Sequence, residues 1–202
     1  MQDLFSNWTG RDDREDGDGG LRWHHIIQDI KEDSSGKDRE KIALLGFCSD
    51  EGVRRNKGRV GAAQGPEAIR RACANLPNHF PPGTLLFEAG DIHPEGKPLI
   101  EAQEKLGERI DELLRGGYFP IVFGGGHEVA WGTYSGVAKA TPEAKKIGII
   151  NVDAHFDIRE PVDGPTSGTG FYQMAQERKA AGMDFHYLCL GVQPHANTKA
   201  LF

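Results

Sequence analysis

The sequence predicts an α/β fold, a three-layer α-β-α sandwich around a mainly parallel sheet, on two observations. From residue 41 onward, short apolar runs alternate with helical patterns, which is typical of a parallel sheet covered on both faces. Two of these runs, Phe119–Phe123 and Ile147–Val152, are bounded by glycine or polar residues, as buried strands are. Each is followed at once by potential metal ligands. Sites in such folds lie beyond the carboxyl ends of the strands, so we expect a site at that edge.

The first forty residues differ from the rest of the chain. Residues 1–40 are polar and rich in charge, and residues 11–20 have the composition of a mobile loop. An apolar stripe in residues 21–30 predicts one short amphipathic helix. We therefore expect two parts, a polar N-terminal segment at 1–40 and an α/β domain at 41–202.

Within 41–202 the elements follow one another regularly. The first strand is predicted at Ile42–Phe47, with a long loop at 48–65 after it. Pro66 suits the first position of a helix, where its missing N–H is not needed. The remaining predicted helices are Pro66–Asn75, Pro98–Arg115, Glu128–Lys139 and Phe171–Ala181, and the remaining strands are Thr84–Phe87, Phe119–Phe123, Ile147–Val152 and Phe185–Val192.

Composition excludes several classes of protein. The formal charge of −6 argues against a nucleic-acid partner. No apolar run approaches the roughly 18 residues of a membrane span, so we expect no membrane contact. The cysteines Cys48, Cys73 and Cys189 form no spaced motif, and the N-terminus lacks a basic and apolar leader. These features predict a cytoplasmic protein with reduced thiols.

The residues after the second run have metal-binding chemistry. Asp153, His155 and Asp157 alternate with Ala154 and Phe156, and alternate residues of an extended backbone point to one face. His127, from the neighbouring strand end, adds a fourth donor. This oxygen and nitrogen set suits manganese most naturally, with iron, cobalt, nickel or zinc as alternatives. A pair of bound ions would activate a water between them. In the alternative interpretation these side chains only cap backbone amides.

Three stretches resemble a known family. G-G-G-H-E at 124–128 and N-V-D-A-H-F-D at 151–157 resemble the metal motifs of the ureohydrolases, the arginase and agmatinase superfamily. The segment G-A-A-Q-G-P-E-A-I-R at 61–70 resembles a further pattern of that family. Residues 8–13, 52–59 and 165–169 are most similar to formimidoylglutamases within it. The resemblance implies an arginase-like fold.

The resemblance also implies a function. It suggests a binuclear hydrolase of linear amidines with two Mn²⁺ per complete subunit, in which His127 and Asp157 bind one ion, His155 binds the other and Asp153 bridges them. The implied reaction cleaves N-formimidoyl-L-glutamate, a dicarboxylate, to L-glutamate and formamide in histidine degradation. Enzymes of this family commonly form homo-oligomers, which we therefore expect here.

Substrate selection is expected in the loop after Asp157. The guanidinium of Arg159 suits a carboxylate; the alternative is a surface ion pair with Glu160 or Asp163. The loop also offers hydroxyls and amides to the α-carboxylate, from Thr166, Ser167, Gly168 and Thr169. Phe171 stands near the place where arginases carry a histidine proton shuttle, so arginase activity itself is not expected. The basic residues between 54 and 59 either are solvated or attract an anionic substrate.

Three other interpretations compete. An agmatinase would need acidic residues for its cationic substrate, which Arg159 and the basic loop argue against. A deacetylase-type hydrolase would need a tandem histidine near the site, and His24–His25 lies far upstream. The third metal motif of the family, S-x-D-x-D, is missing from the 202 residues. We therefore expect a chain that lacks the C-terminal part of the domain, with a partial metal site and weak or no activity, or a non-catalytic metal-binding or assembly fragment.

Overall fold

The strands form two parallel sheets in the computed structural model, which describes residues 4–94, 96, 98–144 and 146–202. The first sheet has four strands in the order β1-β3-β2-β4 and the second has two, β5-β6. Their bounds are β1 Ile27–Asp29, β2 Lys41–Phe47, β3 Leu85–Ile92, β4 Tyr118–Gly124, β5 Gly148–Val152 and β6 His186–Leu190. All pairings are parallel, which confirms the predicted class.

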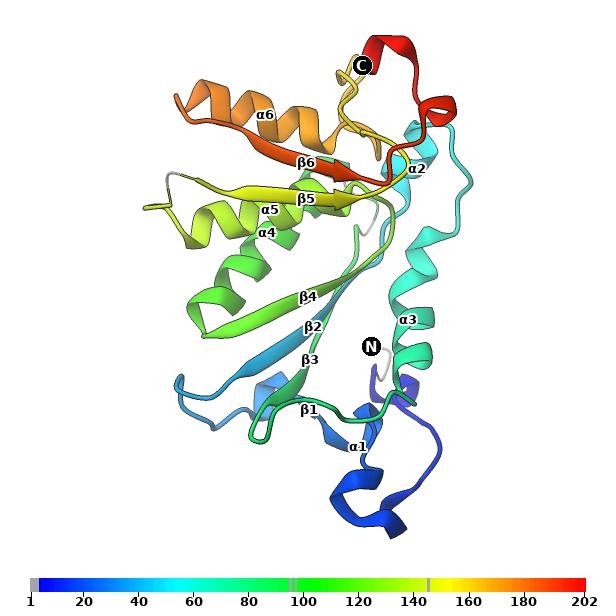
Figure 1. Cartoon of the computed structure of the whole chain (residues 1–202), viewed down its shortest axis with the longest axis vertical. Coiled ribbons are helices and arrows are strands. Elements are labelled where there is room, and N and C mark those ends of the chain that lie inside the picture. Colours follow the sequence, from blue (N-terminus) through cyan, green and yellow to red (C-terminus); the bar gives the residue numbers. More distant parts are fainter. Residues whose placement is uncertain (1–3, 95, 97, 145) are drawn as a thin grey trace.

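The four-stranded sheet is the centre of a three-layer arrangement. In β2, Ala43, Leu45 and Phe47 pack toward α4 (Leu99–Arg115), while Leu44 packs on the opposite face, with the residue that follows α3 (Gly65–Cys73). The two faces are apolar because β2 is an almost continuous apolar run, as an inner parallel strand requires. The prediction of helices on both sides of the sheet is confirmed here (Figure 1).

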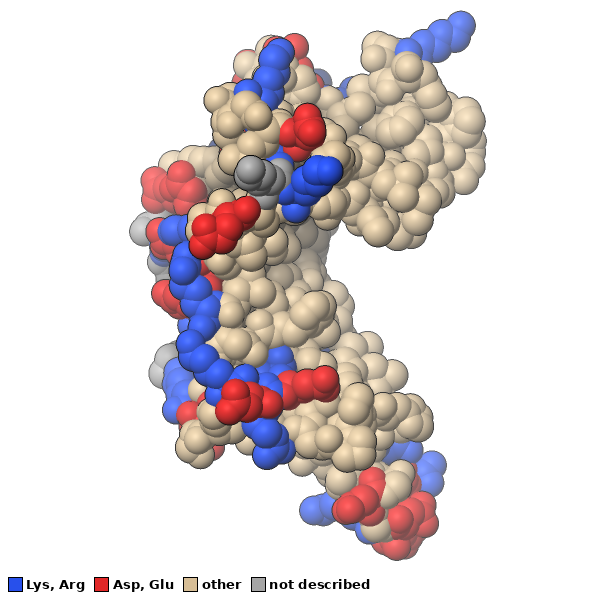
Figure 2. Space-filling view, turned by 60° about the vertical axis from the view of Figure 1, so that its left-hand side comes forward, with Lys and Arg blue, Asp and Glu red and all other residues tan. Residues whose placement is uncertain are grey.

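The second sheet departs from one continuous sheet. Among the described residues β4 pairs only with β2 and β5 only with β6, and Figure 1 shows the two sheets apart, with β4 and β5 as the facing edges. Helices α5 (Val129–Ala140) and α6 (Gly170–Ala180) cover one face of β5-β6. The other face exposes apolar side chains: Ile150 69%, Val152 79%, Leu188 52% and Leu190 45%. The space-filling view shows a hollow between the upper and lower parts of the molecule, with mostly uncharged walls (Figure 2).

The N-terminal segment is more ordered than its composition suggests. The helix predicted at 21–30 is corrected to α1 (Trp23–Ile26), and Ile27–Asp29 instead form β1, because their backbone pairs with β3. The loop predicted at 11–20 contains a 3-10 helix, Arg14–Gly20, next to an ion pair between Arg22 and Asp13. Charge pairing thus orders part of a stretch that looks mobile by composition.

Other boundaries agree with the sequence to within a few residues. There are two exceptions. The strand predicted at Thr84–Phe87 continues as β3 to Ile92, because its backbone stays paired with β2 up to Phe47. The loop predicted at 48–65 contains α2 (Glu51–Arg55) and a short 3-10 helix, Ala62–Gln64. No helix among the described residues is both long enough and apolar enough to cross a membrane.

A buried ion-paired cluster joins β2 to β4 at the start of both strands. Lys41 Nζ lies 2.8 Å from Asp33 Oδ2, and Tyr118 donates its hydroxyl hydrogen to the same carboxylate. Burial raises the pKa of Asp33, but hydrogen bonds from Lys41, Ser35 and Tyr118 outweigh it and hold the pKa well below its usual range. Asp33 therefore stabilises the fold above about pH 4, where the unfolded carboxyl is ionised, and this contribution is lost as the pH falls toward the lower folded pKa.

Tyr118→Phe is expected to lower the free energy of unfolding by about 1–2 kcal/mol at neutral pH, because it removes one donor from a buried carboxylate. Urea denaturation followed by circular dichroism measures the change. Tyr172→Phe is the matched control, since its hydroxyl makes no hydrogen bond within the described part of the chain. Equal stability of the two variants would contradict a role for the Tyr118 hydroxyl.

Candidate metal centre

The turn after β4 brings His127 to the carboxyl edge of the sheet. It runs from Gly124 to Glu128, and α5 begins at Val129. Gly125 has a φ of 28°, and a Cβ at this position would lie 2.3 Å from the carbonyl oxygen of Phe47. Only glycine can lie so close to the end of β2. The Gly126 N–H donates to the carbonyl oxygen of Ser49 at 2.7 Å, which ties the turn to the next loop.

The second cluster follows β5 through a bend. The Asp153 N–H still pairs with the carbonyl of Leu190 at 2.9 Å, but Asp157 has a left-handed backbone with a φ of 48°. The expectation of an extended D-A-H-F-D segment is therefore wrong. The bend, rather than alternation along a strand, directs the two carboxylates.

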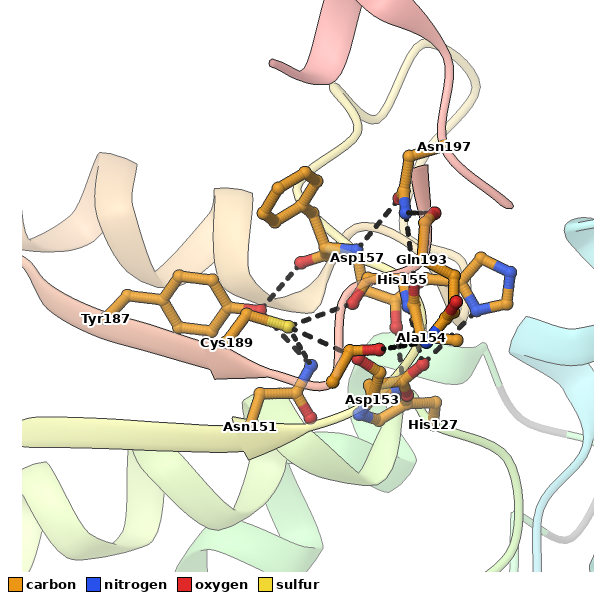
Figure 3. A network of polar contacts seen from close by, with 12 residues as sticks. His127, Asn151, Asp153, Ala154, His155, Asp157, Tyr187, Cys189, Gln193 and Asn197 are labelled. Atoms are coloured by element: carbon orange, nitrogen blue, oxygen red, sulfur yellow. Dashed lines mark hydrogen bonds and ion pairs between the residues drawn. The ribbon is translucent and has the colours of Figure 1, made fainter. Parts of the chain in front are cut away.

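Three of the four predicted ligands meet. His127 Nδ1 lies 2.8 Å from Asp157 Oδ2 and 3.5 Å from Asp153 Oδ2, and one donor atom from each of these residues lies within 4.8 Å of the others. His155 lies outside this group of three, with Nδ1 3.2 Å from the other carboxylate oxygen, Asp153 Oδ1. Asp153 thus stands between the two imidazoles (Figure 3).

The donor set fits a divalent cation. The hydrogen bond between His127 and Asp157 raises the pKa of His127, and this effect exceeds the opposing effect of burial. The imidazole and the carboxylate thus face each other across the place that a cation would take. Two carboxylates and the imidazole of His127 suit manganese among the common divalent ions.

Mn²⁺ affinity is expected to fall as the pH decreases through the raised pKa of His127. The protonated form predominates below that pKa, whereas a metal ligand must be neutral. The loss should approach about tenfold per pH unit for one competing proton. Calorimetric titration with Mn²⁺ between about pH 5 and pH 8, in buffers of different ionisation enthalpy, measures both affinity and proton release. Constant affinity over this range would contradict His127 as a ligand.

A pocket of about 290 Å³ adjoins this group, and it is lined by Asn56, His155, Asp157, Arg159, Ala196, Asn197 and Leu201. Arg159 is therefore on the wall next to the predicted ligands. Neither Glu160 nor Asp163 forms an ion pair with it in the described structure, so its alternative role as a surface ion pair has no support. Asn56 and the C-terminal residues were not predicted from the sequence.

The loop residues 166–169 do not line this pocket. The Thr169 hydroxyl is buried, accepts from the Thr166 N–H at 2.9 Å and hydrogen-bonds Gln173 Oε1 at 2.9 Å. Thr166 Oγ1 accepts from the Gly168 N–H at 3.2 Å. The threonine hydroxyls thus stabilise the loop itself, and the part of Thr166, Ser167 and Thr169 in substrate binding stays a prediction. The buried ring of Phe171 lies edge-on to His127, with ring centroids 5.7 Å apart.

Side chains from β6 and the C-terminal residues hold the backbone of the bend (Figure 3). Asn197 accepts from the Phe156 N–H at 3.1 Å and donates to the carbonyl of Ala154 at 2.8 Å. The Tyr187 hydroxyl donates to the carbonyl of Phe156 at 2.8 Å, and Cys189 Sγ lies 3.2 Å from the carbonyl of His155. No sequence pattern indicates these contacts, since they join residues more than thirty positions apart.

A second set of donors is less suited to a metal. Cys48, Asp91 and His93 each place a donor atom within 4.8 Å of the others. Asp91, however, already pairs with Arg70 at 2.8 Å. Burial and the Asp91 charge raise the pKa of the Cys48 thiol to about 12. This set therefore offers a protonated thiol and a carboxylate that is already paired with Arg70.

Comparison with known proteins assigns the chain to a family. The model of the arginase family matches residues 40–201. The chain belongs to the arginase family. Curated relatives include the formimidoylglutamases of Chromobacterium violaceum, 48% identical over 195 residues, and of Aeromonas hydrophila, 47% identical over 198 residues. The alignments cover 96% and 98% of this arginase-family chain, which spans only 60% and 62% of the length of those two relatives.

Solved structures agree with this family assignment. The Trypanosoma cruzi formiminoglutamase with Mn²⁺ is 32% identical with a TM-score of 0.69, over 81% of this chain and 56% of that one. The Bacillus subtilis formimidoylglutamase is 23% identical with a TM-score of 0.67, over 87% of this chain and 54% of that one, and shows the shared fold. The arginase-like fold predicted from the sequence is thereby confirmed.

Proposed function

We propose that this arginase-family chain forms the metal and substrate side of a metal-dependent hydrolase that cleaves N-formimidoyl-L-glutamate to L-glutamate and formamide. The observation that carries the proposal is the meeting of His127, Asp153 and Asp157 beside a pocket walled by Arg159. The names of the relatives and the manganese in a related structure support it.

In this proposal the side chains have separate tasks. His127, Asp153 and Asp157 would hold manganese, with His155 on the far oxygen of Asp153 for a second ion. Bound manganese supplies an acidified water as nucleophile near neutral pH. Arg159 binds a substrate carboxylate and orients the formimidoyl carbon toward the metal side chains. The apolar ring of Phe171 shields His127 from solvent on one side.

Product analysis tests the proposal against its rivals. The Mn²⁺-loaded protein is supplied separately with N-formimidoyl-L-glutamate, agmatine and L-arginine, and formamide and urea are measured. Formamide from the first substrate, formed at a low rate, and no urea from the others is the expected result. Urea from agmatine would favour the agmatinase alternative. Mn²⁺ binding without any product would favour the non-catalytic alternative.

Arg159→Met is expected to raise KM for N-formimidoyl-L-glutamate by about tenfold to a hundredfold, because it removes a charge-assisted contact to a carboxylate. We expect kcat to change much less, since that contact is made in the ground state as well. Steady-state kinetics measures both. Arg115→Met, at the C-terminal end of α4, is the control. An unchanged KM in the Arg159 variant would remove that residue from the substrate site.

Two further properties belong to the proposal. We expect a homo-oligomer, which light scattering coupled to size-exclusion chromatography measures. We also expect the protein to work in the cytoplasm, in keeping with its three free cysteines.

A further inference from the structure

Glu128 is a buried carboxyl next to a predicted metal ligand. It follows His127 directly, and it is 0% exposed. Its Oε1 accepts hydrogen bonds from the Gly52 N–H at 2.8 Å and from the Ser49 hydroxyl at 3.2 Å. Its Oε2 has no hydrogen-bond partner within the described structure. A buried carboxyl is costly unless it is hydrogen-bonded, so its energy depends on where the turn at 49–52, which includes the first two residues of α2, lies.

The atoms around this carboxyl are closely packed. A Cβ on Gly52 would lie 2.6 Å from the carboxyl carbon of Glu128, and a Cβ on Gly126 would lie 1.9 Å from Oε2. On the backbone side, the buried Gln103 of α4 donates from Nε2 to the Glu128 carbonyl at 2.8 Å. Glu128 is therefore held at its backbone by α4 and at its carboxyl by the turn. Movement of the turn would either break the hydrogen bond from Gly52 or cause a steric clash.

The same turn holds the loop that carries Arg159. The carbonyl of Gly52 accepts from the Ser167 N–H at 3.1 Å, and the Arg159 N–H donates to the carbonyl of Gly168 at 3.1 Å. Arg55, on α2, adds a longer contact of 3.5 Å from Nη1 to the carbonyl of Pro165. A short series of hydrogen bonds thus leads from the Glu128 carboxyl through Gly52 to the loop, and across the loop to Arg159.

We propose that Glu128 is a positioning residue, which sets the distance between the predicted metal ligands and the carboxylate-binding Arg159 through the turn at 49–52. This inference rests on the proposed function, because it assigns Glu128 to substrate placement. The carboxyl makes no hydrogen bond to His127, Asp153 or Asp157 among the described residues, and its charge acts on His127 less than those of Asp157 and Asp153 do. Its loss should therefore weaken substrate binding while Mn²⁺ binding persists.

Two substitutions test the proposal from opposite sides of the contact. Glu128→Ala removes the acceptor, and Gly52→Ala keeps it but forces the turn away. Both are expected to raise KM for N-formimidoyl-L-glutamate by about tenfold, with kcat and the Kd for Mn²⁺ within about threefold of the parent. Glu128→Gln keeps an oxygen that can accept from Gly52, so it should stay within about twofold of the parent in KM. Hydrogen exchange at the Ser167 amide should accelerate in the two alanine variants and not in Glu128→Gln.

Leu113→Ala is the control for lost stability, because Leu113 is buried in the core at the other end of α4. It should leave KM and Ser167 exchange unchanged. Loss of Mn²⁺ affinity in parallel with KM would overturn the proposal, since Glu128 would then act on the metal ligands. Unchanged Ser167 exchange in folded Glu128→Ala or Gly52→Ala would also overturn it. If Glu128→Ala does not fold, Gly52→Ala decides the matter. If the parent shows no turnover, the proposed function fails, and exchange at Ser167 alone decides whether Glu128 holds the loop.

Discussion

Asp153→Ala is expected to abolish tight Mn²⁺ binding and to lower kcat/KM by at least about a thousandfold. The reason is the position of this carboxylate between two imidazoles, with Oδ2 3.5 Å from His127 and Oδ1 3.2 Å from His155. No other described carboxylate contacts both histidines. Removing it therefore takes a donor from each side of the proposed centre.

Without metal, Asp153→Ala is expected to have little effect on the stability of the protein. Asp153 and Asp157 carry like charges close together, and relief of this repulsion offsets the lost hydrogen bond from the His155 N–H to Asp153, so Asp153→Ala should change the melting temperature only slightly without metal. Mn²⁺ should raise the melting temperature of the parent, because it binds the folded state, and should not raise that of Asp153→Ala. Thermal scans with and without Mn²⁺ measure both effects. Asp163→Asn, an exposed acid in the following loop, is the control. A full Mn²⁺-dependent shift in Asp153→Ala would show that the ion binds elsewhere.

Arg70→Met is expected to lower the free energy of unfolding by about 3–5 kcal/mol. Arg70 is 0% exposed. Its guanidinium contacts Glu88 Oε1 at 2.7 Å and Asp91 Oδ1 at 2.8 Å, and the indole N–H of Trp8 donates to the same Glu88 at 2.9 Å. Without the guanidinium, two carboxylates would remain in the core with no cation, so the variant loses more than a surface ion pair would.

Urea denaturation measures the loss. Arg71→Met is the matched control on the same helix, because its ion pair with Glu67 is exposed and should be worth at most about 1 kcal/mol. In the double variant Arg70→Met/Glu88→Gln, one uncompensated charge is removed, so part of the stability should return. A loss below about 1 kcal/mol in Arg70→Met would contradict a structural role for the buried cluster.

Two adjacent arginines, Arg70 and Arg71, differ completely in burial. Arg70 lies in a predicted helix beside Arg71, and nothing local distinguishes a core cation from a solvated one. Burial of Arg70 depends on Glu88 and Asp91, which belong to a distant strand. The bend at Asp157 was missed for a related reason. Alternation along D-A-H-F-D is compatible with an extended strand, and only contacts such as those of Asn197 hold the segment in its bent form.

The sequence alone determined the parallel α/β class and most element positions, and it predicted the side chains that meet in the candidate metal centre. These features depend on local patterns: apolar runs of strand length, apolar stripes of helical period and polar clusters directly after strands. Only the tertiary structure decided the separation of β5-β6 from the first sheet, the burial of Arg70 and Glu128, and the place of Asn56 and Asn197 beside Arg159. The physical reason is that strand pairing and buried hydrogen bonds join residues far apart in the chain. Their energy depends on partners that no local pattern specifies.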